Sequence, residues 1–228
     1  GLMNSVYHKV RKHMLSEKAR LVSKSSNLTC GRILDIGTGT GYFADKMKRE
    51  GWQVSAIEKS PQAREFAKEH FGINVNPPET LFTLKEKSFD VITLWHVLEH
   101  LEQLNRTWDS LFKILKDSGT LIVAVPNAGS YDAEKYHELW AAYDVPRHLW
   151  HFTPTTINAI AAKHGFIMTE RYPMPFDAFY VSMLSEKYMK KSHTFVRGLL
   201  TGTKAWLASL NHKDKSSSMI YIFRKKRL

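Results

Sequence analysis

The stretch Ile33-Leu34-Asp35-Ile36-Gly37-Thr38-Gly39-Thr40-Gly41 (residues 33–41, ILDIGTGTG) decides the fold of this 228-residue chain. Its apolar start and its three glycines predict a buried strand that ends in a tight loop, where the next helix presents unpaired N–H groups. A dinucleotide-binding loop would place its third glycine at position 42, but that residue is Tyr42. The Gly-Lys-Ser/Thr of a phosphate-binding loop is also absent. Asp35, two residues before the first glycine, favours a ligand with a positive charge.

Strands and helices alternate along the rest of the chain. Apolar runs predict strands at 32–36, 52–57, 73–75, 89–95, 120–125, 166–169 and 219–223. Between them, periodicity and capping residues predict helices at 3–24, 41–50, 61–72 and 103–116, with a turn at Gly119, and a further helix capped by Thr153. Such alternation predicts an α/β fold with a parallel sheet between helical layers, which binds its ligands at the carboxyl ends of the strands.

Composition indicates one globular domain spanning residues 1–228, with a helical lead-in over residues 1–30. The chain is 43% hydrophobic and 24% charged, as is ordinary for a soluble protein. No apolar run is long enough for a membrane span or a signal peptide, so we expect a cytoplasmic location. The single cysteine, Cys30, excludes an internal disulfide.

The net charge of +11 is concentrated at the two ends of the chain. Residues 1–24 carry six basic and one acidic side chain, residues 187–228 carry eleven and one, and residues 25–186 carry sixteen and twenty. A nucleic-acid groove would need basic residues around the active site as well. Nucleic acid is therefore not the expected partner, although basic ends could contact a phosphate backbone.

Four segments in order resemble the class I S-adenosylmethionine-dependent methyltransferases over most of the chain. The glycine loop is followed by Glu58, which closes the second strand, then by Ser88-Phe89-Asp90-Val91-Ile92 with Val97-Leu98-Glu99-His100-Leu101, and by Gly119-Thr120-Leu121-Ile122-Val123. The resemblance implies a Rossmann-like three-layer sandwich with a mostly parallel seven-stranded sheet and an antiparallel last strand. It also implies that the loop wraps the amino acid part of the cofactor and that Glu58 holds the ribose hydroxyls, because a carboxylate accepts two hydrogen bonds from a vicinal diol.

The residues expected to bind S-adenosylmethionine, or its product S-adenosylhomocysteine, lie at the ends of these strands. They are Asp35, Gly37, Thr38, Gly39, Gly41, Glu58, Lys59, Glu79, Thr80, Trp95 and His96. Many relatives carry an acidic residue after the third strand that contacts the adenine amino group. Here that region reads Asn76-Pro77-Pro78-Glu79, so Glu79 or a backbone group takes that place.

Histidines after the fourth and fifth strands are the candidate catalytic residues. His96 follows the fourth strand, and His148 and His151 lie in Val145-Pro146-Arg147-His148-Leu149-Trp150-His151-Phe152-Thr153-Pro154. A neutral imidazole suits removal of an acceptor proton near pH 7. In the alternative interpretation, these histidines only hold their loops through hydrogen bonds. Only His137 and Asp144 offer further metal ligands nearby, so we expect no metal site.

The Pro-Arg-His and His-Phe-Thr segments resemble a subgroup near the ubiquinone-biosynthesis O-methyltransferases. Two insertions, 126–152 and 173–218, are expected to form the acceptor side, and the second one as an apolar helical lid. The predicted function is in-line methyl transfer to a small molecule at oxygen. The alternatives are an RNA or protein methyltransferase that uses the basic termini, and a non-catalytic cofactor-binding regulator. The oligomeric state and the acceptor are not predicted.

Overall fold

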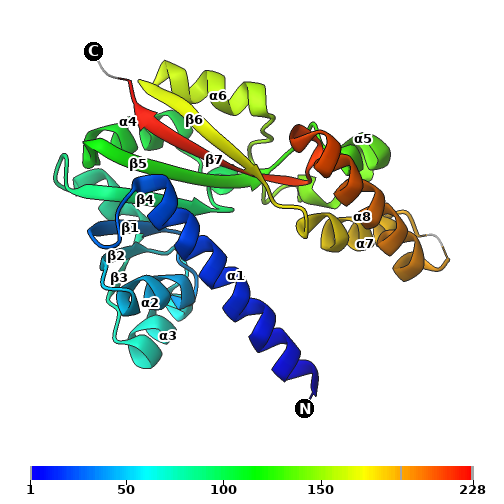
Figure 1. The fold of residues 1–228 in the computed structure, drawn as a ribbon, viewed down its shortest axis with the longest axis horizontal. Coiled ribbons are helices and arrows are strands. Elements are labelled where there is room, and N and C mark those ends of the chain that lie inside the picture. The colour runs from blue at the N-terminus through cyan, green and yellow to red at the C-terminus, as the bar shows by residue number, and fades with distance from the viewer. Residues whose placement is uncertain (1, 191, 227–228) are drawn as a thin grey trace. The chain divides into compact units, whose positions relative to one another are not determined.

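The chain folds around one seven-stranded sheet in the computed structural model, which describes residues 2–190 and 192–226 (Figure 1). The strands are β1 Arg32–Ile36, β2 Gln53–Ile57, β3 Val75–Asn76, β4 Phe89–Trp95, β5 Leu115–Pro126, β6 Phe166–Pro173 and β7 Ser218–Lys225. Their order is β3-β2-β1-β4-β5-β7-β6. Six strands are parallel and the last is antiparallel, which confirms the predicted fold class.

Eight α-helices are present in the described residues. They are α1 Leu2–Ser26, α2 Tyr42–Arg49, α3 Pro61–Phe71, α4 Leu104–Ile114, α5 Tyr131–Tyr136, α6 Pro154–Lys163, α7 Asp177–Tyr188 and α8 Thr194–Asn211. Short 3-10 helices include η1 Pro78–Thr83 and η2 Leu98–His100. Within the described part of the chain, none of the helices has the length and apolar character that a membrane crossing requires.

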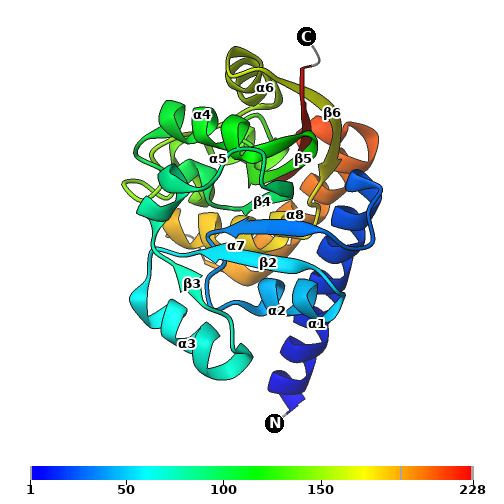
Figure 2. The ribbon, with the colours of Figure 1, turned by 90° about the vertical axis from the view of Figure 1, so that its left-hand side faces the viewer.

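The chain divides into two compact units. The first comprises the described residues within 1–95, 106–122 and 224–228, and the second comprises 96–105 and 123–223. The first unit therefore carries the glycine loop, and the second carries both predicted insertions. Figure 2 shows β1, β2 and β3 of the first unit side by side.

In the first unit, parallel register places the ligand-facing residues at one level. Asp35 lies opposite Ala56 of β2 and Thr93 of β4, and Ile36 lies opposite Ile57. The strands are nearly continuous apolar runs because both faces of a parallel sheet are covered. Since β1 and β2 end together, the loops that follow them leave the same edge of the sheet.

The second unit is built from capped and closely packed helices. Thr153 accepts a hydrogen bond from the Thr156 N–H and its own N–H donates to Thr156 Oγ1, so α6 begins with the predicted cap. Along α8, Gly198 and Gly202 lie so close to α7 that a Cβ atom would come within 2.6 Å of Met183 and 2.8 Å of Phe179. The two helices run side by side in Figure 1.

The prediction for residues 103–120 is wrong in one respect. The helix ends at Ile114, and β5 begins at Leu115, so Gly119 lies within a strand and not in a turn. Two ion pairs lie at this polar start of β5: Lys116 Nζ is 2.7 Å from Asp90, and Asp117 is 2.7 Å from Lys87. The other predicted elements are present, with bounds that differ by a few residues at their ends.

Candidate active site

Three left-handed glycines shape the loop after β1. The φ angles of Gly37, Gly39 and Gly41 are 73°, 57° and 85°, a region that other residues rarely adopt. A Cβ atom on Gly41 would lie 2.8 Å from the Cβ of Ala67, whereas one on Gly39 would meet no atom within 4 Å. Gly41 therefore permits close packing against α3, and Gly39 borders open space where a ligand can approach the backbone.

Backbone N–H groups fix the carboxylate of Glu58 beside this loop. Gly39 N–H donates to Oε2 at 2.8 Å, and Ser60 N–H donates to Oε1 at 2.9 Å. The Arg64 guanidinium donates to the carbonyls of Glu58 and Lys59, both at 2.9 Å. Each carboxylate oxygen keeps a further lone pair for a ligand hydroxyl. Sequence reasoning indicated neither Ser60 nor Arg64 as part of the site, since neither residue lies in the glycine pattern.

Asp35 is buried at the end of β1, with 2% of its surface exposed. Burial raises the pKa of this carboxyl to about 6, although a 2.7 Å hydrogen bond donated by Thr93 opposes that rise. The charge of Lys18, on α1, also lowers the Asp35 pKa. A buried carboxylate that ionises near neutral pH is suited to a cationic ligand group.

Trp95 closes β4 and packs between two elements of the first unit. Its ring meets Phe43 edge-on at 5.6 Å, and Lys18 Nζ lies 4.6 Å from its centroid. The indole N–H is buried and has no hydrogen-bond partner among the described residues. Sequence reasoning missed Lys18, because nothing in the basic lead-in distinguishes it from its neighbours.

The remaining cofactor candidates lie at less enclosed positions. Thr38 is half-buried in the loop, Lys59 is exposed after Glu58, and Glu79 and Thr80 lie on η1, the first exposed and the second half-buried. The structure therefore does not enclose Glu79.

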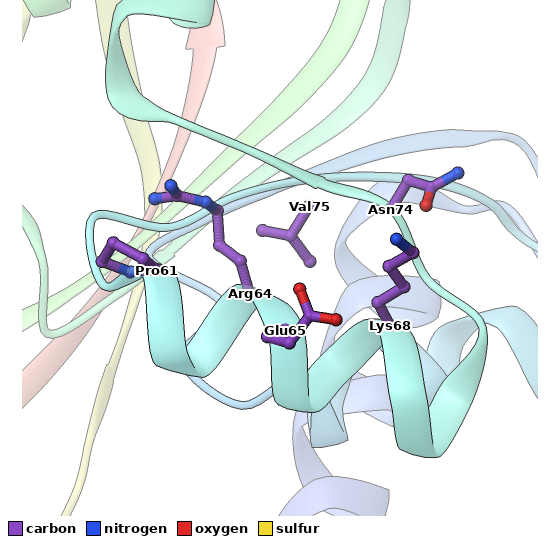
Figure 3. A pocket seen from close by; sticks show the side chains of 6 residues that line it. All are labelled: Pro61, Arg64, Glu65, Lys68, Asn74 and Val75. Atoms are coloured by element: carbon purple, nitrogen blue, oxygen red, sulfur yellow. The ribbon is translucent and has the colours of Figure 1, made fainter.

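A pocket of about 330 Å³ opens on α3, and its lining residues lie between Lys59 and Glu79 in the sequence. Figure 3 shows Arg64, Glu65 and Lys68 of α3 facing Asn74 and Val75 across it. None of its lining residues is a predicted cofactor ligand. The predicted ligands therefore do not line this pocket, although it shares Arg64 with the anchoring of Glu58.

In the second unit, His96 lies between two carboxylates. Its Nδ1 is 3.5 Å from Glu99 and its Nε2 is 3.4 Å from Asp177 of α7, while a third of its side chain is exposed. Desolvation lowers the His96 pKa, but the two carboxylates outweigh it and raise the pKa to about 9. The ring is therefore protonated at neutral pH, and an imidazolium has no lone pair with which to accept a proton.

Hydrogen bonds to the segment around η2 hold residues 145–154, the predicted histidine-rich stretch. The N–H groups of Leu149 and Trp150 both donate to the Glu99 carbonyl, at 2.8 and 3.2 Å. The Trp150 indole donates to the Leu101 carbonyl at 2.8 Å. His151 is exposed, and its Nε2 bonds the Tyr143 carbonyl at 3.1 Å. The bond to the Tyr143 carbonyl ties His151 to another part of the same loop.

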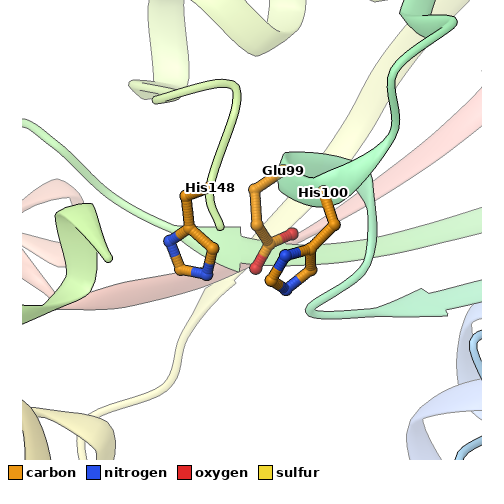
Figure 4. A group of neighbouring side chains, drawn as sticks. All are labelled: Glu99, His100 and His148. Carbon is orange, nitrogen blue, oxygen red and sulfur yellow. The ribbon is translucent and has the colours of Figure 1, made fainter. Parts of the chain in front are cut away.

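His148 instead meets Glu99 and His100, two residues that the sequence did not single out as ligands (Figure 4). One ligand atom from each of the three side chains lies within 4.8 Å of the others. Of the expected further ligands, Asp144 lies 3.9 Å from His148 Nε2, and His137 is not in the cluster. Sequence reasoning missed the cluster because His148 lies 48 or more residues after Glu99 and His100.

The fold and the glycine–carboxylate arrangement define a class of α/β proteins that bind a nucleoside cofactor at the carboxyl edge of the sheet. The family model described as "Methyltransferase domain" matches residues 7–171, which is more than half of the chain. The chain therefore belongs to this family of S-adenosylmethionine-dependent methyltransferases.

Curated relatives and solved structures agree with this membership. Over 101 residues the chain is 37% identical to the mitochondrial ubiquinone biosynthesis O-methyltransferase of Schizosaccharomyces pombe, a match that covers 41% of this chain and 37% of that protein. The chain spans less than half the length of the curated relatives it matches. A methyltransferase from Archaeoglobus fulgidus superposes with a TM-score of 0.63 at 21% identity, covering 94% of each chain. Haemonchus contortus phosphoethanolamine N-methyltransferase 2, solved with S-adenosylmethionine, superposes with a TM-score of 0.61 at 19% identity, covering 92% of this chain and 53% of that one. These two likenesses concern the fold.

Proposed function

We propose that this chain transfers the methyl group of S-adenosylmethionine to a hydroxyl of a small molecule. The observation that carries the proposal is the pairing of the Glu58 carboxylate with the Gly39 N–H beside open space, in a chain of the methyltransferase-domain family. The O-methyltransferase names of the curated relatives support oxygen as the acceptor atom.

The described residues fit the cofactor in four respects. Glu58 presents an oriented carboxylate to a ribose diol, and Gly39 leaves space that a Cβ atom would fill. Asp35 offers a negative charge to the ammonium of the amino acid part. The buried Trp95 N–H is a donor whose desolvation cost a ligand acceptor would offset. The cofactor supplies a methyl group on a sulfonium, and the residues of the chain bind and orient it.

Alignment of the acceptor is the main requirement of an in-line displacement, and proton removal is a second one. The catalytic roles of His96, His148 and His151 stay predictions, and for His96 the raised pKa favours orienting the acceptor over removing its proton. We also propose that both units belong to one methyltransferase domain, because β5 and β7 each contribute residues to both. The cytoplasmic location stays a prediction as well.

Transfer of labelled methyl groups tests the proposal. The purified chain, with labelled S-adenosylmethionine, is offered a panel of small hydroxyl, amine and carboxylate compounds, total RNA and unfolded protein. We expect label in hydroxyl compounds, and at least a tenfold lower kcat/KM in Glu58→Gln, because a neutral amide is a weaker acceptor for the ribose diol. Glu69→Gln, an exposed change on α3, is the matched control and should retain the wild-type value.

Other distributions of label would contradict the proposal. Label confined to RNA, with binding that weakens steeply as salt increases, would support the RNA alternative instead. Label confined to protein would support a protein methyltransferase. Cofactor binding without transfer to any member of the panel would favour the non-catalytic regulator.

A further inference from the structure

We propose that Glu99, His100 and His148 form a binding site for one divalent transition-metal ion of the Zn²⁺, Co²⁺, Mn²⁺ or Fe²⁺ class. Figure 4 shows the Glu99 carboxylate lying between the two imidazole rings. The three ligand atoms are within 4.8 Å of one another, and the ring centroids of His100 and His148 are 4.6 Å apart. All three residues belong to the second unit.

The two rings are held in the tautomer that a metal ligand needs. His148 Nδ1 lies 2.7 Å from the Ala142 carbonyl, and His100 Nδ1 lies 3.0 Å from the Arg147 carbonyl. A carbonyl only accepts, so each Nδ1 carries the proton and each Nε2 keeps its lone pair. A backbone carbonyl that fixes the far nitrogen of an imidazole is the usual outer contact of a metal-bound histidine.

Glu99 supplies the negative charge of the site. Its side chain is 1% exposed, and neither carboxylate oxygen has a hydrogen-bond partner among the described residues. His96 Nδ1 forms an ion pair with Oε1 at 3.5 Å, and this contact leaves Oε2 without a hydrogen bond. A buried carboxylate oxygen without a hydrogen bond is costly, and a bound cation removes that cost.

The ligand set determines the class of ion. Two imidazoles and one carboxylate suit Zn²⁺ and its first-row neighbours, whereas Mg²⁺ and Ca²⁺ prefer oxygen ligands alone. Three protein ligands leave open positions, and Asp144, 3.9 Å from His148 Nε2, is close enough to reach one of them through a water molecule. An oxygen of the acceptor could occupy another open position; this last step rests on the proposed methyl transfer.

Metal titration of the tag-free, chelator-treated protein tests the site. Zn²⁺ is followed by calorimetry and Co²⁺ by its visible absorption, without S-adenosylmethionine or acceptor. We expect one ion per chain, and at least tenfold weaker binding in Glu99→Gln, His100→Asn and His148→Asn. The asparagine variants keep a donor close to the position of Nδ1–H, so the loop keeps its bond to Ala142 or Arg147 while Nε2 is lost. His151→Gln, three residues from His148, is the control and should bind as wild type does.

Three results would overturn the inference: no stoichiometric binding, equal binding in the wild type and the three ligand variants, or saturable binding of Mg²⁺ but not of Zn²⁺ or Co²⁺. Unfolding midpoints measured without metal establish that each variant is folded. If His148→Asn alone is unstable, the Glu99→Gln and His100→Asn titrations decide. Because no cofactor is present, failure here leaves the proposed methyl transfer standing.

Discussion

At the residue scale, Asp35 shows how ligand binding and stability oppose each other. The chain keeps a carboxylate at a position where only 2% of its surface reaches solvent, and one side-chain hydrogen bond from Thr93 stabilises it. Its pKa of about 6 lies above the ordinary value of 3.8 because burial disfavours the charge. The folded chain therefore binds this proton more tightly than the unfolded chain does, and stability falls as the pH rises from about 4 to about 6.

Asp35→Asn should stabilise the chain in the absence of ligand. Asparagine keeps an oxygen for the Thr93 hydroxyl and removes the charge, so we expect the free energy of unfolding at pH 7.5 to increase by up to about 3 kcal/mol. The gain should disappear below about pH 4, where the carboxyl is protonated in both states. Urea unfolding of the wild type, Asp35→Asn and the surface variant Glu69→Gln measures this difference. A loss of stability in Asp35→Asn at pH 7.5 would show that the carboxylate is stabilised in the fold by contacts stronger than its desolvation cost.

At the element scale, the α7–α8 pair depends on glycine as much as on apolar side chains. Gly198 and Gly202 lie one helical turn apart on α8, and both are buried against α7. A methyl group on Gly198 would lie 2.6 Å from the Cα atom of Met183, which is backbone and cannot rotate away. The spacing is visible in the sequence as Gly-x-x-x-Gly. The sequence does not show that these glycines face α7.

Gly198→Ala should destabilise the chain although alanine is the better helix former. Alanine gains about 1 kcal/mol in helix propensity, and the overlap with Met183 forces α7 and α8 apart at a cost of about 1–3 kcal/mol or more. We expect a net decrease in the free energy of unfolding, measured by urea unfolding. Lys204→Ala, an exposed change on the same helix, is the control and should be neutral or slightly stabilising. A stabilised Gly198→Ala would mean that the two helices can separate freely.

At the scale of the whole molecule, the sequence predicts those features that depend on residues close together in the chain. The β1 loop, the position of Glu58 after β2 and the cap of α6 follow from short patterns of apolar, glycine and capping residues, and the structure has all three. The start of β5 was missed because Lys116, Asp117 and Ser118 are polar and give no apolar run that would indicate a strand.

The sequence predicted the glycine loop and Glu58 of the cofactor site, but it did not predict the contacts between distant residues. Contacts of Lys18 with Trp95, and of His148 with Glu99 and His100, join parts of the chain that no local pattern connects. The second contact depends on the bonds that the Leu149 and Trp150 N–H groups donate to the Glu99 carbonyl. These hydrogen bonds exist only in the folded backbone. Neither helix and strand propensity nor residue spacing shows which N–H groups of a loop will donate to a distant carbonyl.

Calorimetric titration with S-adenosylhomocysteine measures cofactor binding by the whole chain without any acceptor. We predict one binding site per chain, at least tenfold weaker binding in Glu58→Gln, and no binding of NAD⁺, because the loop lacks the third glycine of a dinucleotide site. Glu69→Gln should bind like the wild type. No binding of S-adenosylhomocysteine to the folded chain, or binding of NAD⁺ in its place, would show that the glycine loop and Glu58 do not form a site for this cofactor.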